Sequence, residues 1–399
     1  MPAELPARRA GTQPAVLLTN AEERSMLAAC RSLQRAGYDV GAASYTQLAP
    51  AQWSRSCRWR VRVLDPRRDT SGFVAQLRAA LTRRPYATLI PGSDSALLAI
   101  SREREHLSDL TELGLPAHAV VERALSRTHL TEAARKAGLT VITSIRCADL
   151  DEALTAARSL GFPVVLKSID AAFAGAGTVS GAPKGRLVGS EAELRREASD
   201  FHAGLLLQPV VPGEPISFAG VIAAGRLRAV AVARYLRMWP ANGGSVAFAE
   251  TIATTPALEQ RVCALLAEIG WEGIFELELI RTGARDAKDF VPIDLNPRPY
   301  GSMALAAAAG APLAAIWCDW LLHKEARADD QPVRARAGVR YRWEDGELRH
   351  LAWQLRHRHL RAALIPLRPR RGITHAHLQL DDPLPLLARV AYLSKRALA

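Results

Sequence analysis

Two short apolar segments near residue 280 carry polar side chains at alternating positions, a pattern that few folds accommodate. The first reads FELELI and contains Glu276 and Glu278; the second reads VPIDLNPR and contains Asp294 and Asn296. Successive side chains of a strand point to opposite faces, so each pair shares one face of its strand. If the strands are neighbours, three oxygen ligands converge, as Mg²⁺ requires. We therefore predict Glu278, Asp294 and Asn296 as metal ligands, with Glu276 as the alternative to Glu278. The alternative to a metal site is that these residues are ordinary exposed carboxylates on an edge strand.

The composition is that of a globular protein. The chain has 399 residues, enough for two or three domains, and 49% of them are apolar and 23% charged. No apolar run reaches the roughly 18 residues of a membrane-spanning helix, and the N-terminus lacks the apolar stretch of a signal peptide. The five cysteines include no CxxC pair, which disfavours a zinc cage or a disulfide framework. We therefore expect a cytoplasmic protein without a transmembrane segment.

Strand and helix patterns alternate along the first hundred residues, which indicates a doubly wound, Rossmann-like α/β layer with a parallel sheet. The segments are strands at Ala15–Thr19, Tyr38–Ala43 and Ala87–Ile90 and a helix at Ala21–Ala36. Ligands of such sheets bind at the carboxyl ends of the strands, here near Thr19–Asn20 and Ser93–Asp94. No GxGxxG motif is present, so a dinucleotide site has little support. A purely structural layer is the alternative.

From about residue 116 the strands come in runs with helices between them, which indicates an α+β domain with an antiparallel sheet. Helices are predicted at Arg127–Ala137 and Pro256–Ile269, and strands at Pro163–Lys167, Leu205–Val211, Ile216–Ile222, Leu227–Ala233, Ile274–Ile280 and Phe290–Leu295. We predict three parts: an N-terminal domain over 1–115, a two-lobed domain over 116–320 with its smaller lobe within 116–205, and a basic extension over 321–399.

Lys167 and the glycine-rich loop that follows it form a second polar feature. Only 6 of the 52 basic residues are lysines, and a compact ammonium at a strand end suits a phosphate oxygen. Gly175, Gly177 and Thr178 belong to a small-residue loop whose backbone N–H groups can approach phosphates. The loop is not a Walker A sequence. Taken alone, Lys167 could be a strand-end lysine that extends its ammonium to solvent, and the loop could be an ordinary hairpin. The lysine and the loop together favour a phosphate site.

A resemblance to a known family rests on these features together. The matching positions are Lys167, the glycine loop, Gln208, Glu214, Glu278 and the segment IDLNPRPYGS, which contains Asn296 and Arg298. Their order and approximate spacing resemble those of the ATP-grasp superfamily, in particular the carbamoyl-phosphate-synthase-like, or carboxylate–amine ligase, group. The match covers about Pro116–Trp320, and the N-terminal layer looks like the domain that usually precedes the grasp. IDLNPRPYGS is specific, whereas the glycine loop alone is not.

The resemblance implies a set of positions that bind ATP: Arg127, Lys167, Gly175, Gly177, Thr178, Gln208, Pro209, Val211 and Glu214. Within it, the glycine loop would close over the β- and γ-phosphates. The Pro209 carbonyl and the Val211 N–H would contact adenine, and Glu214 would hold the ribose. Arg127 and Gln208 depart from the family, which has lysine and usually Glu at these positions, but each keeps the charge or the hydrogen-bonding type.

The resemblance also implies that Glu278, Asp294 and Asn296 hold Mg²⁺, for which Mn²⁺ can substitute. Asp294 is one methylene shorter than the usual Glu, so the metal geometry can differ. Asn296 and Arg298 would be the catalytic residues. The planar fork of Arg298 fits the transferring phosphoryl group or a substrate carboxylate.

The function implied is that of an ATP-dependent, ADP-forming ligase that activates a small-molecule carboxylate as an acylphosphate for attack by an amine or a thiol. Arg234 and Arg237 are candidates for substrate contacts, with an exposed loop as the alternative. A homodimer is compatible with this function.

Two other functions stay open. One is a non-catalytic ATP-binding regulatory module. The other is a binder of nucleic acid or an anionic surface through Val333–Arg371, which has 11 Arg and 3 acidic residues in a chain of net charge +12. That segment lacks an RNA-binding motif, so we do not expect a nucleic-acid partner.

Overall fold

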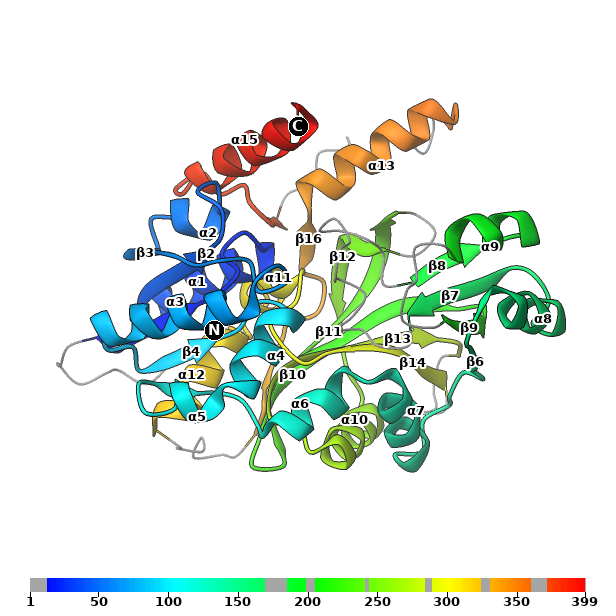
Figure 1. Cartoon of the computed structure of the whole chain (residues 1–399), viewed down its shortest axis with the longest axis horizontal. Coiled ribbons are helices and arrows are strands. Elements are labelled where there is room, and N and C mark those ends of the chain that lie inside the picture. The colour runs from blue at the N-terminus through cyan, green and yellow to red at the C-terminus, as the bar shows by residue number, and fades with distance from the viewer. Residues whose placement is uncertain are drawn as a thin grey trace.

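Three sheets organise the part of the chain that the structure describes (Figure 1). The computed structural model describes residues 13–168, 185–198, 205–240, 244–283, 289–323, 331–359 and 372–398. No helix within these ranges is long and apolar enough to cross a membrane.

The N-terminal sheet is parallel throughout. The strands of this sheet and the helices that connect them are, in chain order, β1 (Ala15–Leu18), α1 (Arg24–Arg35), β2 (Asp39–Ser44), α2 (Pro50–Trp53), β3 (Trp59–Arg62), α3 (Thr70–Arg83), β4 (Thr88–Ile90), α4 (Asp94–Arg102), α5 (Arg104–Leu107) and β5 (Glu112–Leu113). The strand order is β3-β2-β1-β4-β5. The carboxyl ends of β1, β2 and β4 therefore meet at one edge, as the sequence predicts.

The central sheet has eight strands in the order β14-β13-β10-β11-β12-β16-β17, with β15 beside β11. Its strands are β10 (Glu214–Ala223), β11 (Arg226–Trp239), β12 (Ser245–Ile252), β13 (Gly273–Arg281), β14 (Phe290–Asn296), β15 (Val333–Arg334), β16 (Arg340–Arg342) and β17 (Ile373–His375). Six of them pair antiparallel in one run from β14 to β16. The two parallel pairs, β11–β15 and β16–β17, involve the short C-terminal strands.

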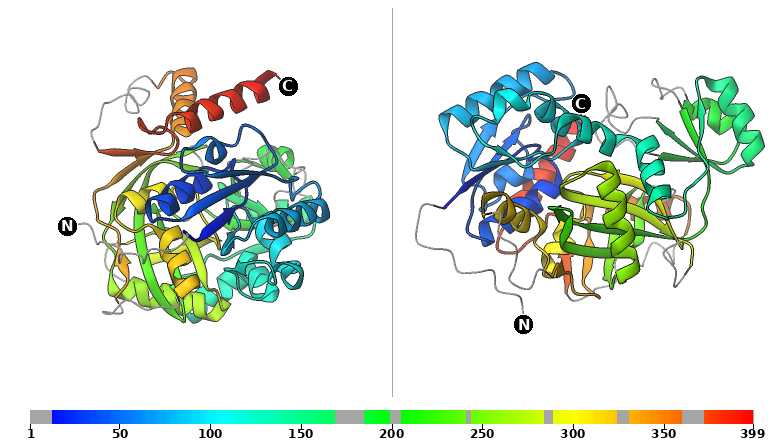
Figure 2. Two further views of the ribbon diagram at one scale, coloured as in Figure 1. Left: turned by 90° about the vertical axis from the view of Figure 1, so that its left-hand side faces the viewer. Right: turned by 90° about the horizontal axis from the view of Figure 1, so that it is seen from below.

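A smaller antiparallel sheet, in the order β6-β9-β7-β8, forms a separate lobe. Its elements are β6 (Ile145–Cys147), α8 (Leu150–Leu160), β7 (Val164–Ser168), β8 (Gly185–Val188), α9 (Glu191–Ala198) and β9 (Leu205–Pro209). Helices α8 and α9 cover it, and the lobe stands at the end of the molecule far from the N-terminal sheet (Figures 1 and 2).

Alternating apolar side chains of the central sheet build two cores, one on each face. Phe218, Phe275 and Leu277 pack on one face with helices α6 (His118–Leu125), α7 (Arg127–Lys136) and α10 (Pro256–Ile269). Ala219 and Val221 pack on the opposite face with α1, α11 (Met303–Ala308) and α12 (Leu313–His323). Helix α1 therefore lies between the N-terminal and central sheets, and joins them in one core.

Two helices follow the central strands at the top of Figure 1, α13 (Glu344–Arg356) and α15 (Leu384–Leu398). Helix α15 packs on α2 of the N-terminal domain, where Arg31 and Asp382 form a buried ion pair with Nε and Oδ2 2.9 Å apart. The predicted boundaries near residues 115 and 320 stay predictions. Strands β15–β17, from beyond residue 320, belong to the central sheet.

The predicted combination of a parallel sheet with antiparallel sheets is confirmed. Helix α10 has the predicted bounds, and α1 begins three residues later than predicted, at Arg24. The sequence did not predict α2, β3 and α3. Strand β3 (WRVR) alternates between half-buried and exposed side chains, so it lacks the apolar face from which a strand is identified.

Candidate functional site

The two polar strands pair as the sequence predicts. Strands β13 and β14 run antiparallel with Glu276 opposite Asn296 and Glu278 opposite Asp294. Residues directly opposite in such a ladder project to the same face. The Asn296 Nδ2 donates to Glu276 Oε2 at 3.0 Å and to Glu278 Oε1 at 3.2 Å. We call these four residues the acid–amide face; it lies on the side of the central sheet that packs against the N-terminal domain.

The two glutamates of this face have different surroundings. Glu276 is 4% exposed, and its Oε1 accepts hydrogen bonds from Ser217 Oγ and Tyr235 OH, both at 2.9 Å. Burial, reinforced by the charges of Glu276 and Glu278, raises the pKa of Tyr235 well above its ordinary value, so the phenol stays a donor. Glu278 is half-buried. These surroundings favour Glu278 as the ligand-facing carboxylate and Glu276 as its support.

Two basic side chains from outside the central sheet reach β14. Arg127, the first residue of α7, places Nη2 3.7 Å from Asp294 Oδ1, and both side chains are buried. Lys167, on β7 of the small lobe, donates from Nζ to the carbonyl of Ile293 at 2.9 Å. The structure thus brings together the two cationic positions, which the resemblance assigns to the nucleotide, and the acid–amide face.

The ligand atoms that this face offers are of the type that a hard divalent cation prefers. Glu278, Asp294 and Asn296 offer carboxylate and amide oxygens from paired positions on one face. Within the described ranges, however, no group of three or more His, Cys, Asp and Glu side chains is arranged to hold a metal ion. Here the Asn296 amide nitrogen hydrogen bonds to Glu278, so a cation at this face would replace that hydrogen bond.

Three of the positions implied for ATP lie at the hinge, the connection between the small lobe and the central sheet: Gln208, Pro209 and Val211. Gln208 is near the end of β9, is 8% exposed, and donates from Nε2 to Ser144 Oγ at 2.7 Å. Pro209 ends β9, and Val211 lies in the connection to β10. The chain therefore passes from lobe to sheet at the positions that the resemblance assigns to adenine.

Glu214, the position implied for the ribose, begins β10 and forms an ion pair with Arg281 at the end of β13. Its carboxylate is thus held at the same end of the central sheet as the hinge. The glycine-loop positions Gly175, Gly177 and Thr178 lie outside the described residues. Their predicted role over the phosphates stays a prediction.

Arg298 is held by a partner that the sequence analysis did not predict. Its Nε lies 2.6 Å from Asp94 Oδ1, and its Nη2 donates to Asp94 Oδ2 at 3.2 Å. Asp94 is the first residue of α4, directly after the carboxyl end of β4. The ligand-binding edge predicted near Ser93–Asp94 therefore faces the IDLNPR segment. The sequence placed the carboxylate of Asp94 at the predicted ligand-binding edge, but nothing in the sequence linked Asp94 to Arg298.

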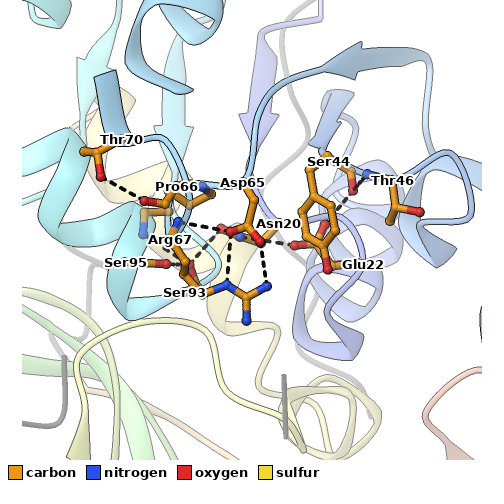
Figure 3. A network of polar contacts seen from close by, with 12 residues as sticks. Asn20, Glu22, Ser44, Thr46, Asp65, Pro66, Arg67, Thr70, Ser93 and Ser95 are labelled. Carbon is orange, nitrogen blue, oxygen red and sulfur yellow. Dashed lines mark hydrogen bonds and ion pairs between the residues drawn. The ribbon is translucent and has the colours of Figure 1, made fainter. Parts of the chain in front are cut away.

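A polar network occupies the same edge of the N-terminal sheet (Figure 3). Ser93 Oγ donates to Asn20 Oδ1 at 3.1 Å, and Asn20 Nδ2 donates to Glu22 Oε1 at 3.2 Å. Ser44 Oγ donates to Glu22 Oε2 at 2.6 Å. Side-chain hydrogen bonds thus link residues at the carboxyl ends of β1, β2 and β4. The network reaches Arg298 through Asp94, the neighbour of Ser93.

Glu22 gives this edge a pH dependence. Burial, reinforced by the charge of Glu23, raises the pKa of Glu22 from 4.5 to about 7 despite the hydrogen bonds from Ser44 and Asn20. The folded state then keeps a proton that the unfolded chain releases, so this carboxyl lowers stability as the pH rises from 4.5 to 7, and the full cost remains above pH 7. We expect Glu22→Gln to raise the free energy of unfolding at pH 8 by roughly 1–3 kcal/mol.

Urea denaturation at pH 8 and at pH 4.5 checks this expectation. The gain should vanish at pH 4.5, where wild-type Glu22 is protonated in the folded state and Gln mimics the protonated form. Glu112→Gln, at an exposed carboxyl of the same domain, is the control and should give no such difference between the two pH values. A Glu22→Gln protein with the same change in stability at both pH values would contradict the raised pKa.

The arginines proposed for substrate contacts are engaged in ion pairs. Arg234 Nη2 lies 2.6 Å from Glu250 Oε2 on β12, and Arg237 Nη2 lies 2.6 Å from Glu347 Oε2 on α13. These contacts tie β11 to its neighbours. Both arginines therefore lie on a strand rather than in the exposed loop of the alternative, and their ion pairs give them a structural role.

Solved structures resemble this fold across most of its length. An N5-carboxyaminoimidazole ribonucleotide synthetase in complex with ADP has a TM-score of 0.57 and 15% identity, over 82% of this chain and 80% of that chain. The biotin carboxylase domain of the Hydrogenobacter thermophilus 2-oxoglutarate carboxylase, a dimer with MgADP and bicarbonate, has a TM-score of 0.61 and 16% identity, over 82% and 73%. An L-amino acid ligase from Bacillus licheniformis has a TM-score of 0.57 and 13% identity, over 81% and 77%.

Comparisons of the sequence alone find no match. No family model and no curated protein matches the chain. At identities of 13–16%, the likeness to the solved structures establishes a shared fold.

Proposed function

We propose that this chain, which has the ATP-grasp fold, is an ATP- and Mg²⁺-dependent ligase that activates a carboxylate as an acylphosphate. An amine, or less often a thiol, then attacks the acyl carbon, and ADP and phosphate are released. The observation that carries the proposal is the acid–amide face, with Lys167 and Arg127 at β14 and Arg298 beside Asn296. Anion-binding cations next to oxygen ligands for a metal suit a metal–triphosphate complex.

Each residue of the site has a role in this reaction. Lys167 and Arg127 would bind phosphate oxygens, because an ammonium and a guanidinium are charge-assisted donors. Glu278, Asp294 and Asn296 would hold Mg²⁺, which supplies positive charge against the charge that develops on the phosphoryl oxygens. Arg298 would stabilise the transferring phosphoryl group or orient the substrate carboxylate.

The bond changes need little proton transfer from the protein. A carboxylate oxygen attacks the γ-phosphorus, and the bond from phosphorus to the bridging oxygen breaks with ADP as the leaving group. The amine nitrogen then attacks the acyl carbon and gives up a proton, and phosphate leaves with the electron pair of the C–O bond and takes up that proton. Catalysis comes mainly from positioning and charge stabilisation, which agrees with a site built from cations, carboxylates and an amide.

The ligands of the similar structures support the nucleotide part of the proposal. Those structures hold ADP in the synthetase, and MgADP with bicarbonate in the carboxylase domain. Glycine-loop closure, the use of Mn²⁺, a cytoplasmic location and a homodimer belong to the same proposal. The carboxylate and the amine are small molecules whose identity the site leaves open.

The described part of the basic segment Val333–Arg371 gives little support to a nucleic-acid binder. Three of its arginines pair with carboxylates of the chain: Arg334 with Glu259, Arg340 with Glu250, and Arg342 with Glu347. Paired charges release fewer counterions on binding a polyanion.

A screen for phosphate release tests the proposal. The chain is incubated with ATP, Mg²⁺ and pairs of carboxylates and amines, including the common amino acids. We expect phosphate release that needs both a carboxylate and Mg²⁺. Tight ATP binding with no phosphate release for any pair would favour the regulatory module instead.

A further inference from the structure

The ion pair between Asp94 and Arg298 joins the N-terminal domain to the candidate site. The two residues are 204 positions apart in the chain, and their side chains are only 16% and 15% exposed. The contact is bidentate, with 2.6 Å from Nε to Oδ1 and 3.2 Å from Nη2 to Oδ2. Such a fork fixes the plane of the guanidinium as well as its position.

The other donors of Arg298 reach the acid–amide face. Nη1 donates to the Pro299 carbonyl at 3.0 Å, and Nη2 also donates to Asn296 Oδ1 at 3.4 Å. The amide nitrogen of Asn296 in turn donates to Glu276 and Glu278. A continuous series of contacts therefore runs from Asp94 through Arg298 and Asn296 to both carboxylates.

Asp94 is itself firmly placed. It begins α4, whose N-cap Ser93 accepts a hydrogen bond from the Ala96 N–H through Oγ at 3.1 Å. Ser93 Oγ also donates a hydrogen bond to Asn20 Oδ1, two residues after the end of β1. A second tie between the same parts of the molecule, from Arg24 Nε to the Gly301 carbonyl at 2.9 Å, keeps α1 against the loop that follows Arg298.

Asp94 is the counter-charge of the largely buried Arg298 guanidinium, which it contacts at both Nε and Nη2. Without Asp94, a largely buried guanidinium would lose its main counter-charge and one side of its fork.

We propose that Asp94 is a positioning residue that fixes Arg298 and, through it, the amide of Asn296, so that the acid–amide face can receive the metal–nucleotide complex. The inference rests on the proposed function. It makes the N-terminal domain part of the active site, because one of its carboxylates sets the geometry of two residues on the central sheet. Residues that orient metal ligands in this way typically contribute 10- to 100-fold to metal affinity or activity.

Calorimetry of ATP binding with and without Mg²⁺ tests this role without a known substrate. The quantity measured is the ratio of the ATP Kd in the absence of Mg²⁺ to that in its presence. We expect Asp94→Asn and Asp94→Ser to lower this ratio by roughly 10- to 100-fold while the Mg²⁺-free Kd changes little. Asp94→Glu, which restores the carboxylate, should recover most of the ratio.

Asp65→Asn is the matched control. Asp65 lies at the same sheet edge and pairs bidentately with Arg67, with contacts of 2.8 and 3.0 Å, but this pair stays within the N-terminal domain (Figure 3). The ratio of the two ATP Kd values, without and with Mg²⁺, should be the same for Asp65→Asn as for the wild type. Thermal melting identifies the folded variants, and two substitutions at Asp94 guard against the loss of one through misfolding.

Two results would overturn the inference, and they are distinguishable. A folded Asp94→Asn or Asp94→Ser protein with the wild-type ratio would remove the positioning role and leave the proposed function intact. A wild-type chain that binds no ATP would remove the proposed function, and the inference with it.

Discussion

Replacement of Asp294 by Asn, or of Glu278 by Gln, is expected to lower turnover by a factor of roughly 10²–10³ or more. Each amide keeps the shape of the carboxyl but loses the negative charge that would hold Mg²⁺ beside the developing phosphoryl charge. Turnover is measured as Mg²⁺-dependent phosphate release. Asp294→Asn also weakens the buried contact with Arg127, so thermal melting accompanies the assay to show that the fold is largely intact.

A carboxyl-to-amide change away from the site provides the control. Glu268 is exposed and pairs with Lys136, with Oε2 and Nζ 2.9 Å apart, so Glu268→Gln should leave turnover unchanged. Near-normal Mg²⁺-dependent turnover in folded Asp294→Asn and Glu278→Gln proteins would show that the metal is held elsewhere.

Lys167→Ala is expected to weaken ATP binding by roughly 1.5–3 kcal/mol, or about 10- to 150-fold. The substitution removes a charge-assisted donor from β7 that lies against the Ile293 carbonyl of β14. It also removes a contact between the small lobe and the central sheet, so part of the loss would come from a less closed lobe. Calorimetry with ATP and Mg²⁺ measures the affinity.

Lys136→Ala is the control for Lys167→Ala, because Lys136 is an exposed lysine whose charge pairs with Glu268. Its ATP affinity should match that of the wild type. An unchanged ATP affinity in a folded Lys167→Ala protein would end the assignment of Lys167 to the phosphates.

The pairing of Glu278 with Asp294 could be predicted from the sequence because its signal is local. Alternation at every second residue places a side chain on a face, and short apolar segments identify the strands. Only the adjacency of the two strands had to be assumed, and β13 and β14 are indeed neighbours. The helix that begins at Pro256 was equally clear, since a proline at the first turn and a following glycine mark both its ends.

The contact between Asp94 and Arg298 could not be predicted in the same way. It depends on how the N-terminal and central sheets are oriented, and that orientation is set by the packing of α1, α11 and α12 between them rather than by any local pattern. The ion pair of Arg237 could not be predicted for a related reason, because its partner Glu347 lies on α13, 110 residues away in the chain. The pair of Arg234 with Glu250 depends on the register of β11 and β12, in which these two residues are opposite each other.

The C-terminal region shows a third limit of sequence patterns. The sequence analysis did not predict β15, β16 and β17, which lie beyond residue 320 and join the central sheet. These strands have only two or three residues each. A strand of that length is too short to show a period of two, so its charged side chains dominate what the sequence displays.

The identity of the nucleotide product tests the central claim most directly. The chain is incubated with ATP, Mg²⁺, hydroxylamine and a panel of carboxylates, and the nucleotides and hydroxamates are quantified. An acylphosphate route predicts ADP in equal amount to a hydroxamate, because hydroxylamine traps the activated acyl group after the γ-phosphoryl transfer. AMP and pyrophosphate as the products would contradict the account and identify an adenylating enzyme instead.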